Sequence, residues 1–286
     1  MDKITLNAYG KINLGLDVIG KRPDGYHELK MIMQTVGLCD TLEMRKQAEG
    51  ITIRTNKKYL PTNEKNLIYQ AVKLLTDEFK IQSGVAVKLS KVIPVAAGMA
   101  GGSTDCAAAL TGMNKLFNLG LSKEELAKRG VKIGADVPYC IMGGTMLAEG
   151  IGDILTPLRP APRCRVLLVK PNIFISTKWV YQNLNIDNLE KHPDIDGIIK
   201  AINENDLLEM GNQLDNVLES VTIAKYPIIQ KIKDNMLSLG AVSSLMSGSG
   251  PTVFGLFDDE KKALTAYEAF KKSKYIQNVF LTELKN

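Results

Sequence analysis

A run of small residues between a strand-like and a helix-like segment most constrains how this chain can fold. The run PVAAGMAGGST spans residues 94–104 and contains three glycines. Before it, residues 85–93 alternate as in a strand. After it, apolar side chains recur every three or four residues from Cys106 to Phe117, which is the period of a buried helix face. The predicted order is therefore strand, glycine loop and helix.

This order is typical of an anion-binding site. The first turn of a helix has free backbone N–H groups and carries the positive end of the helix dipole. Glycines allow positive φ and let a phosphate approach the backbone. Ser103 or Thr104 is predicted to cap the helix, with Asp105 in its first turn. The alternative is a glycine turn that only packs a helix on a strand, but the combination of three glycines, two hydroxyls and this context favours phosphate binding.

Composition excludes several classes of function. The chain has 286 residues, 45% hydrophobic and 23% charged, which is enough for two domains of average size. No apolar run reaches the roughly 18 residues of a membrane span, and no signal peptide is recognisable, so we expect a cytoplasmic protein without a membrane partner. A net charge of +5 suits a small anionic ligand and is too low for nucleic-acid binding. Four scattered cysteines and two histidines argue against zinc.

A lysine and an asparagine interrupt the first strand-like region. Residues 4–19 are interpreted as two β segments that meet near Gly10, and alternation places Lys11 and Asn13 on one face. A lysine in an apolar strand is costly unless its charge meets an anion. The alternative is an edge-strand lysine that faces water.

The segment that follows contains one false motif and one informative turn. Residues 15–22 fit the start of a Walker A loop, but Arg22 stands where Ser or Thr should bind magnesium, so we reject that interpretation. Tyr26 and His27 come directly after a Pro-Asp-Gly turn. An aromatic ring beside a histidine can stack a flat base and hydrogen-bond its edge. A structural turn with a surface histidine is the alternative.

Two further segments are predicted at helix ends. Asn66 is predicted to cap a helix, and Ser122 opens another with the spacing of a capping box. Asp136 precedes Val137 and Pro138. Because proline bars helix continuation and favours an extended residue before it, Asp136 is predicted at a helix-to-strand junction. A helix-capping or turn aspartate is the alternative.

The proline-rich residues 158–162 are the predicted linker, which gives domains of residues 1–158 and 159–286. After it we expect a buried strand at residues 166–169 and a short helix holding residues 179–181. A helical region at residues 194–239 and a strand–turn–strand at residues 243–257 follow. The chain is predicted to finish with a helix at residues 262–272 and a strand at residues 279–284.

The glycine loop resembles the phosphate loop of the GHMP kinase superfamily, which includes galactokinase and the homoserine, mevalonate and phosphomevalonate kinases. It departs from the usual pattern at Ala100, commonly glycine, and at Thr104, commonly serine, but both keep their backbone donors. The segments around Lys11 and Gly248 resemble the first and third motifs of the superfamily. The resemblance implies an α+β fold with two domains: an N-terminal nucleotide-binding domain of mixed β-sheet and helix, and a C-terminal ferredoxin-like α/β layer.

Lys11 and Asn13, followed by RPDGYH at residues 22–27, are similar to one branch of this superfamily, which phosphorylates a cytidine-diphosphate-linked alcohol in isoprenoid precursor synthesis. The resemblance implies that Asp136 is the catalytic base and that Lys11 orients the hydroxyl and stabilises phosphoryl charge. It implies that the substrate is bound by Asn13, Tyr26, His27, Thr177, Tyr181 and Gly248. Tyr26 and His27 would receive the cytosine, with Tyr181 on its other face, and core packing is the alternative for Tyr181.

The same resemblance implies that ATP donates the phosphoryl group, accompanied by Mg²⁺, for which Ser103 is a candidate ligand. It implies that ATP is bound by a helix start and by the whole loop, namely Asn66, Leu67, Pro94, Val95, Ala96, Ala97, Gly98, Met99, Ala100, Gly101, Gly102, Ser103 and Thr104. A monomer or weak homodimer is expected. Two alternatives remain open: another small-molecule kinase of the homoserine or mevalonate type, and a catalytically inactive nucleotide sensor.

Overall fold

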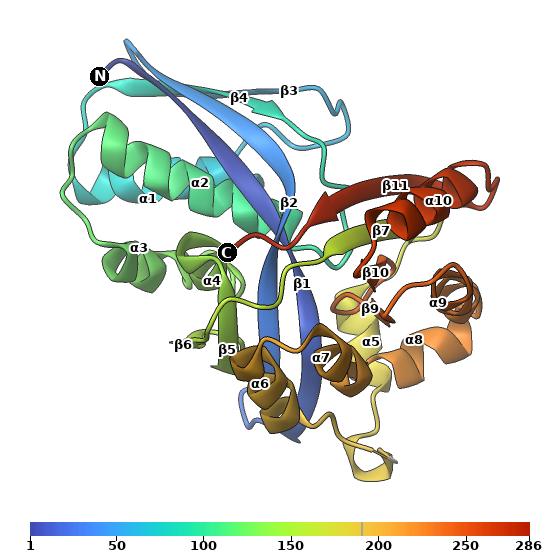
Figure 1. The fold of residues 1–286 in the computed structure, drawn as a ribbon. Helices are drawn as coiled ribbons and strands as arrows, with labels where there is room; N and C mark the ends of the chain where they lie inside the picture. Colours follow the sequence, from blue (N-terminus) through green and yellow to red (C-terminus); the bar gives the residue numbers. More distant parts are fainter. Residues whose placement is uncertain (190) are drawn as a thin grey trace. The chain divides into compact units, whose positions relative to one another are not determined.

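The computed structural model describes residues 1–189 and 191–286, which group into two compact units. Unit 1 consists of Met1–Gly10, Leu38–Val95 and Ala100–Met142, and unit 2 of Lys11–Gly37, Ala96–Met99 and Gly143–Asn286. Two long strands, β1 (Lys3–Lys21) and β2 (His27–Gln47), drawn in blue in Figure 1, contribute residues to both units. Because β1 is continuous, the predicted break near Gly10 is wrong.

Unit 1 combines a sheet with four helices. The end of β2 pairs antiparallel with β4 (Gly84–Ser90), which pairs in parallel with β3 (Ile51–Thr55). Its helices are α1 (Leu67–Glu78), α2 (Gly101–Leu116), α3 (Lys123–Gly130) and α4 (Val137–Met142). The predicted capping box at the start of α3 is confirmed, because Glu125 N donates to Ser122 Oγ at 3.1 Å and Ser122 N donates to Glu125 Oε2 at 2.8 Å.

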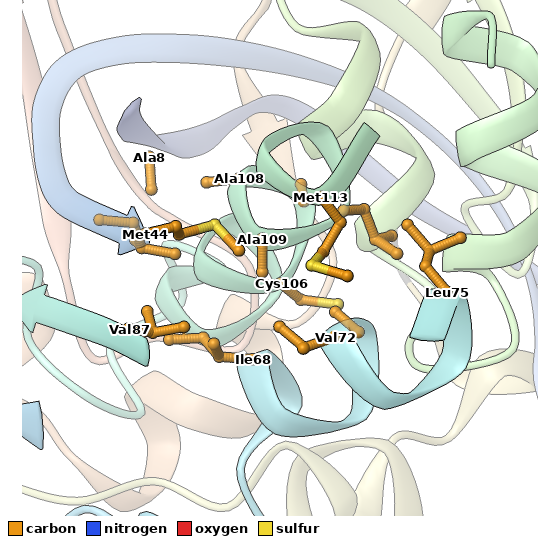
Figure 2. Packing of buried hydrophobic residues seen from close by; sticks show 14 of the residues in the cluster. Ala8, Met44, Ile68, Val72, Leu75, Val87, Cys106, Ala108, Ala109 and Met113 are labelled. Atoms are coloured by element: carbon orange, nitrogen blue, oxygen red, sulfur yellow. The ribbon is translucent and has the colours of Figure 1, made fainter. Parts of the chain in front are cut away.

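The core of unit 1 forms where α1 and α2 meet. Figure 2 shows Cys106 and Met113 of α2 pointing toward Val72 and Leu75 of α1. All four side chains are fully buried, as the helical spacing of apolar residues in both segments predicts. This packing fixes the two helices against each other, so the beginnings of α1 and α2 have defined positions within the unit.

Unit 2 contains an antiparallel four-stranded sheet in the order β11 (Ile276–Glu283), β7 (Arg165–Pro171), β10 (Val253–Phe257), β9 (Ser243–Met246). The start of β2 pairs with β5 (Thr145–Gly150), which pairs with β6 (Ile154–Pro157). β1 pairs in parallel with the two-residue strand β8 (Asp215–Asn216), which was not predicted. The predicted strand–turn–strand of residues 243–257 is confirmed as β9 and β10.

The helices of unit 2 are α5 (Thr177–Asn183), the 3₁₀ helix η1 (Ile186–Asn188), α6 (Ile195–Glu204), α7 (Leu207–Gln213), α8 (Glu219–Lys225), α9 (Ile228–Ser238) and α10 (Glu260–Lys271). The described content is therefore α+β, as predicted. The predicted domain boundary after residue 158 differs from the division into these two units and stays a prediction.

Within residues 1–189 and 191–286, the helices are too short or too polar to cross a bilayer.

Candidate active site

The glycine loop contains three residues in the left-handed region of backbone conformation. The φ values of Ala96, Gly98 and Ala100 are +51°, +74° and +53°. Ala100 is the N-cap of α2 and makes no side-chain cap hydrogen bond. A non-glycine residue in this conformation costs roughly 1–2 kcal/mol, so the surrounding structure must hold the turn in place.

The predicted cap of α2 by Ser103 or Thr104 is wrong, because the helix already begins at Gly101. Asp105 is likewise beyond the first turn. Because α2 begins at Gly101, the N–H groups of Gly101, Gly102 and Ser103 lie in its first turn. The helix has no carbonyl oxygen one turn earlier that could accept hydrogen bonds from them. The end of the loop therefore offers three successive N–H donors.

The two hydroxyls of the loop have different surroundings. Thr104 Oγ1 donates to the carbonyl oxygen of Tyr9 at 2.6 Å, and Thr104 N donates to Ala100 O at 2.9 Å, so both of its donors are engaged within unit 1. Ser103 is half-buried, and a Cβ placed on Gly134 would lie 3.9 Å from Ser103 Oγ. The chain just before Asp136 therefore lies beside the first turn of α2.

The start of α1 also lies beside the start of α2. Asn66 caps α1 as predicted, because its Oδ1 accepts a hydrogen bond from Ile68 N at 2.9 Å. A Cβ placed on Gly102 would lie 3.5 Å from Leu67 Cδ1. Three of the predicted segments, at residues 66–67, 101–104 and 134–136, thus come together within unit 1.

Asp136 precedes a helix, so the predicted helix-to-strand junction is wrong. Its carbonyl oxygen accepts a hydrogen bond from Cys140 N at 3.1 Å, and α4 begins at Val137. Proline is tolerated in the first turn of a helix, where its missing N–H would have no partner. Pro138 therefore lies at the start of α4 and does not hold Val137 extended.

Lys11 and Asn13 lie on one face of β1, as predicted. Both are buried, with 6% and 0% of their surfaces exposed, so Lys11 is not an edge-strand lysine that faces water. Lys11 Nζ donates to Asn13 Oδ1 at 2.7 Å, and Asn13 Nδ2 donates to Met31 Sδ at 3.3 Å. Since the partner of Lys11 in this contact is a neutral amide, the contact leaves the ammonium charge uncompensated.

Residues of three predicted motifs meet in unit 2. Lys11 N donates to Met99 O at 3.3 Å, and Ser247 Oγ donates to Gly98 O at 2.9 Å. Gly248 has a φ of +56°, and a Cβ there would lie 3.3 Å from Gly98 O and 3.5 Å from Asn13 Oδ1. Lys11, Asn13, the middle of the glycine loop and Gly248 are therefore neighbours.

Asn216 holds the third motif and was missed by sequence reasoning. It is 1% exposed, and its Nδ2 donates to Met246 O at 2.8 Å and to Gly248 O at 2.9 Å. Its Oδ1 accepts from Leu218 N at 3.0 Å. A single asparagine within the predicted helical region of residues 194–239 carries no local signal for this role.

His27 and Tyr181 form an aromatic pair within unit 2. Their ring centroids are 5.1 Å apart with a tilt of 33°. Tyr181 is half-buried, which argues against pure core packing, and Tyr26 is 60% exposed. Burial and the charge of Lys21 lower the pKa of His27, which favours the neutral imidazole, a form that can both donate and accept a hydrogen bond. Thr177 Oγ1 and Ser249 Oγ share a hydrogen bond of 2.8 Å.

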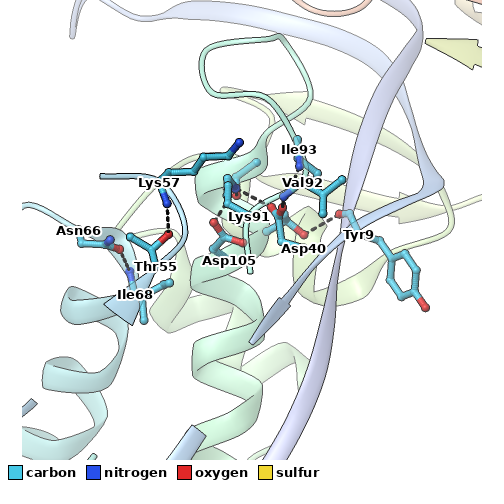
Figure 3. A network of polar contacts seen from close by, with 12 residues as sticks. Tyr9, Asp40, Thr55, Lys57, Asn66, Ile68, Lys91, Val92, Ile93 and Asp105 are labelled. Carbon is cyan, nitrogen blue, oxygen red and sulfur yellow. Dashed lines mark hydrogen bonds and ion pairs between the residues drawn. The ribbon is translucent and has the colours of Figure 1, made fainter. Parts of the chain in front are cut away.

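A buried cluster of three ionisable side chains, Asp40, Lys91 and Asp105, was also missed (Figure 3). Lys91 Nζ lies 2.6 Å from Asp40 Oδ2 and 2.6 Å from Asp105 Oδ2. Asp40 Oδ1 accepts hydrogen bonds from the backbone N–H groups of Val92 and Ile93. Asp105 Oδ1 is buried and has no hydrogen-bond partner among the described residues. Burial raises the pKa of Asp105 to about 8, Lys91 opposes this shift and Asp40 adds to it.

We expect Asp105→Asn to flatten the pH dependence of the free energy of unfolding. The folded-state pKa of Asp105 lies above the ordinary aspartate value of about 3.9, so the native state holds a proton that the unfolded state releases. The stability that this group contributes is therefore present below about pH 4 and is lost as the pH rises toward about 8.

Urea unfolding at several pH values between about 5 and 9 measures this slope. Asp77→Asn is the control, because Asp77 is exposed on α1 and pairs with Lys73. Equal slopes for the wild type and Asp105→Asn would mean that Asp105 is ionised in the folded protein.

The described residues, 1–189 and 191–286, contain no group of three or more His, Cys, Asp or Glu side chains placed to hold a metal ion.

Family models match both halves of the chain. The model described as the GHMP kinases N terminal domain matches residues 66–144, and that for the GHMP kinases C terminal domain matches residues 198–277. These ranges contain the start of α1, the end of the glycine loop, Asp136 and the third motif.

Full-length relatives share about half of their residues with this chain. A protein from Lachnoclostridium phytofermentans named 4-diphosphocytidyl-2-C-methyl-D-erythritol kinase is 56% identical over 283 residues, covering 99% of this chain and 97% of the relative. A protein of the same name from Lachnospira eligens is 52% identical over 284 residues, covering 99% of both.

Solved structures share the fold. The crystal structure of a 4-(cytidine 5'-diphospho)-2C-methyl-D-erythritol kinase matches with a TM-score of 0.86 and 28% identity, covering 99% of this chain and 100% of that chain. A homoserine kinase from Cytophaga hutchinsonii matches with a TM-score of 0.79 and 20% identity, covering 99% and 95%, which is a likeness of fold alone.

Proposed function

This chain belongs to the GHMP kinase family, and we propose that it transfers the γ-phosphoryl group of ATP to the 2-hydroxyl of 4-diphosphocytidyl-2-C-methyl-D-erythritol. The products would be the 2-phosphate and ADP, in the non-mevalonate route to isoprenoid precursors. The observation that carries this proposal is the 56% and 52% identity, over nearly the whole chain, to two relatives named for that kinase. The contact between His27 and Tyr181 supports it further, because it brings two of the predicted cytosine-binding rings together.

The end of the glycine loop supports the binding of ATP phosphates. Phosphoryl transfer passes through a loose transition state, so positioning and charge stabilisation dominate catalysis. We infer that the N–H groups of Gly101, Gly102 and Ser103 hold the phosphates at the positive end of the helix dipole of α2. We infer that Leu67, whose Cδ1 lies 3.5 Å from a Cβ placed on Gly102, and the preceding Asn66 contact the adenine.

Asp136 is the proposed general base and Lys11 its proposed partner. Asp136 would accept the proton of the 2-hydroxyl, a contribution on the order of 10²–10⁴-fold. The ammonium of Lys11 would orient the hydroxyl and stabilise charge that develops on the phosphoryl oxygens. Support for these roles comes from the position of Gly134 beside Ser103 and from the burial of Lys11 next to a neutral amide.

We propose that ATP enters as its magnesium complex. Since the described residues hold no acidic cluster, the phosphates would supply most of the ligands of the ion. The half-buried hydroxyl of Ser103, in the first turn of α2, is the candidate protein ligand. Bound there, the ion would neutralise phosphate charge.

Replacing His27 or Tyr26 by alanine is expected to raise the KM of the cytidine substrate by about 10-fold and to leave the KM of ATP unchanged. Stacking of one base on an aromatic ring contributes about 1–3 kcal/mol, which sets this magnitude. Steady-state kinetics with each substrate varied in turn measure the two constants. Tyr275→Ala is the control, because Tyr275 is 75% exposed, directly precedes β11 and is not one of the predicted substrate-binding residues. A change in the KM of ATP would place the nucleotide, and not the cytosine, beside His27.

An ADP-release assay with a panel of alcohols tests the function itself. We expect turnover with 4-diphosphocytidyl-2-C-methyl-D-erythritol and none with homoserine or mevalonate. Turnover with either of those two instead would identify another kinase of the GHMP family. Binding of nucleotide without ADP release from any alcohol would identify an inactive nucleotide sensor.

The proposed reactants also indicate where the protein works. ATP and a diphosphate-linked alcohol are charged metabolites that do not cross a bilayer unaided, so we propose that the chain acts on small molecules in the cytoplasm. We also propose that it is a monomer or weak homodimer. Light scattering at micromolar concentration measures the oligomeric state.

A further inference from the structure

The buried cluster of Asp40, Lys91 and Asp105 touches the glycine loop at its end. Besides its two carboxylate partners, Lys91 Nζ donates to the carbonyl oxygen of Gly101 at 2.7 Å. A Cβ placed on Gly101 would lie only 3.0 Å from Lys91 Nζ, so the ammonium lies directly against the first residue of α2. The three N–H donors of a lysine are thereby all engaged within the protein.

The same cluster also holds the chain just before the loop. Asp40 Oδ1 accepts hydrogen bonds from Val92 N and Ile93 N, which directly precede the loop at residues 94–104. Asp40 Oδ2 pairs with Lys91, which bonds to Gly101 on the other side of the loop. One buried ion pair therefore connects the two ends of the loop (Figure 3).

This connection stabilises a turn that is unfavourable by itself. Ala100 has a φ of +53° and receives no side-chain cap, so nothing local in the sequence favours its left-handed conformation. Holding Ile93 and Gly101 at a fixed separation restricts the conformations available to the residues between them. The turn at Ala100 therefore determines the direction of the N–H groups of Gly101, Gly102 and Ser103 in the first turn of α2.

We propose that Lys91 is a positioning residue for ATP: through Asp40 and Gly101 it fixes the loop conformation that presents the N–H groups of α2 to the phosphates, without itself touching ATP. This role rests on the proposed kinase function. It predicts an effect on nucleotide affinity that loss of stability alone would not produce.

The test compares two variants with the wild type. Lys91→Met keeps the length of the side chain but leaves the buried Asp40 carboxylate without its ammonium partner, which endangers folding. The triple variant Lys91→Met, Asp40→Asn, Asp105→Asn removes all three ionisable groups and keeps an Oδ1 acceptor at position 40. Arg129→Met is the control in unit 1, because Arg129 pairs with Glu78 away from the loop.

Calorimetry with magnesium and a non-hydrolysable ATP analogue gives nucleotide affinity independently of the acceptor substrate, so it remains informative if the proposed function fails. We expect the folded variants to bind the analogue at least about 10-fold more weakly. We expect the KM of ATP to rise by a similar factor while the KM of the cytidine substrate stays the same. Arg129→Met should lower the melting temperature without changing either constant.

Unchanged affinity for the analogue in a folded Lys91 variant would overturn the assignment. If both variants failed to fold, Lys91 would be a requirement of the fold itself, and the positioning role would be rejected. If the wild type released no ADP with the cytidine substrate while the variants still lost nucleotide affinity, the proposed function would fail and the role of Lys91 would stand.

Discussion

Asp136→Asn is expected to lower kcat by at least about 10²-fold while the KM values of both substrates stay within about twofold. Asparagine has the size and shape of aspartate but cannot accept a proton from the 2-hydroxyl. The carbonyl oxygen of Asp136, which accepts a hydrogen bond from Cys140 N of α4, is unchanged by the substitution, so the backbone at the site should keep its conformation. The loss therefore falls on the transition state and not on binding.

A double-mutant cycle with Lys11→Met shows whether the two residues act on the same transition state. If they do, the double variant should be far less impaired than the product of the two single losses. Asp77→Asn, an exposed change on α1, should keep wild-type turnover. Near-normal kcat for Asp136→Asn would exclude Asp136 as the base.

Gly98→Ala is expected to be the most damaging single change in the glycine loop. The φ of Gly98 is +74°, which costs an L-residue roughly 1–2 kcal/mol. In addition, a Cβ there would overlap the carbonyl oxygen of Ser247. Because backbone and not a flexible side chain is in the way, the loop and the third motif must move apart, at a further cost of about 1–3 kcal/mol. We expect a fall of about 3 kcal/mol in the free energy of unfolding and a raised KM for ATP.

Gly25→Ala is the matched control for Gly98→Ala. Gly25 has a φ of +85°, but its Cβ would meet nothing within 4 Å. It should therefore show only the conformational cost, about 1 kcal/mol, with normal ATP kinetics. Urea unfolding and steady-state kinetics on both variants measure the difference. If Gly98→Ala were no worse than Gly25→Ala, the close approach of Gly98 to Ser247 would not exist in solution.

Elements with a local signal could be predicted from the sequence. Strict alternation in β1 is enough to place Lys11 and Asn13 on one face, and their hydrogen bond confirms it. Asn66 is a residue type that favours helix caps, Ser122 has the spacing of a capping box, and both cap the predicted helices. In these cases the residues that determine the structure are only a few positions apart.

Local rules failed where distant contacts decide the outcome. Ser103 and Thr104 are good caps, yet α2 begins earlier because the loop is held in a left-handed turn at Ala100. Asp40, Lys91 and Asp105 are separated by 51 and 14 positions along the chain, so only the pairing of β2 with β4 and the packing of α2 bring them together. Pro138 excludes a helix interior but not a helix start, and the sequence around it does not distinguish the two.

The interleaving of the two units along the chain has a practical consequence for recombination between relatives. Because β1 and β2 each carry residues of both units, a single crossover anywhere in the gene mixes parental sequences within at least one unit. An exchange of one intact unit needs junctions after Gly10, Gly37, Val95, Met99 and Met142. Two of these junctions fall inside the glycine loop, so chimeras in this family must inherit that loop from compatible parents.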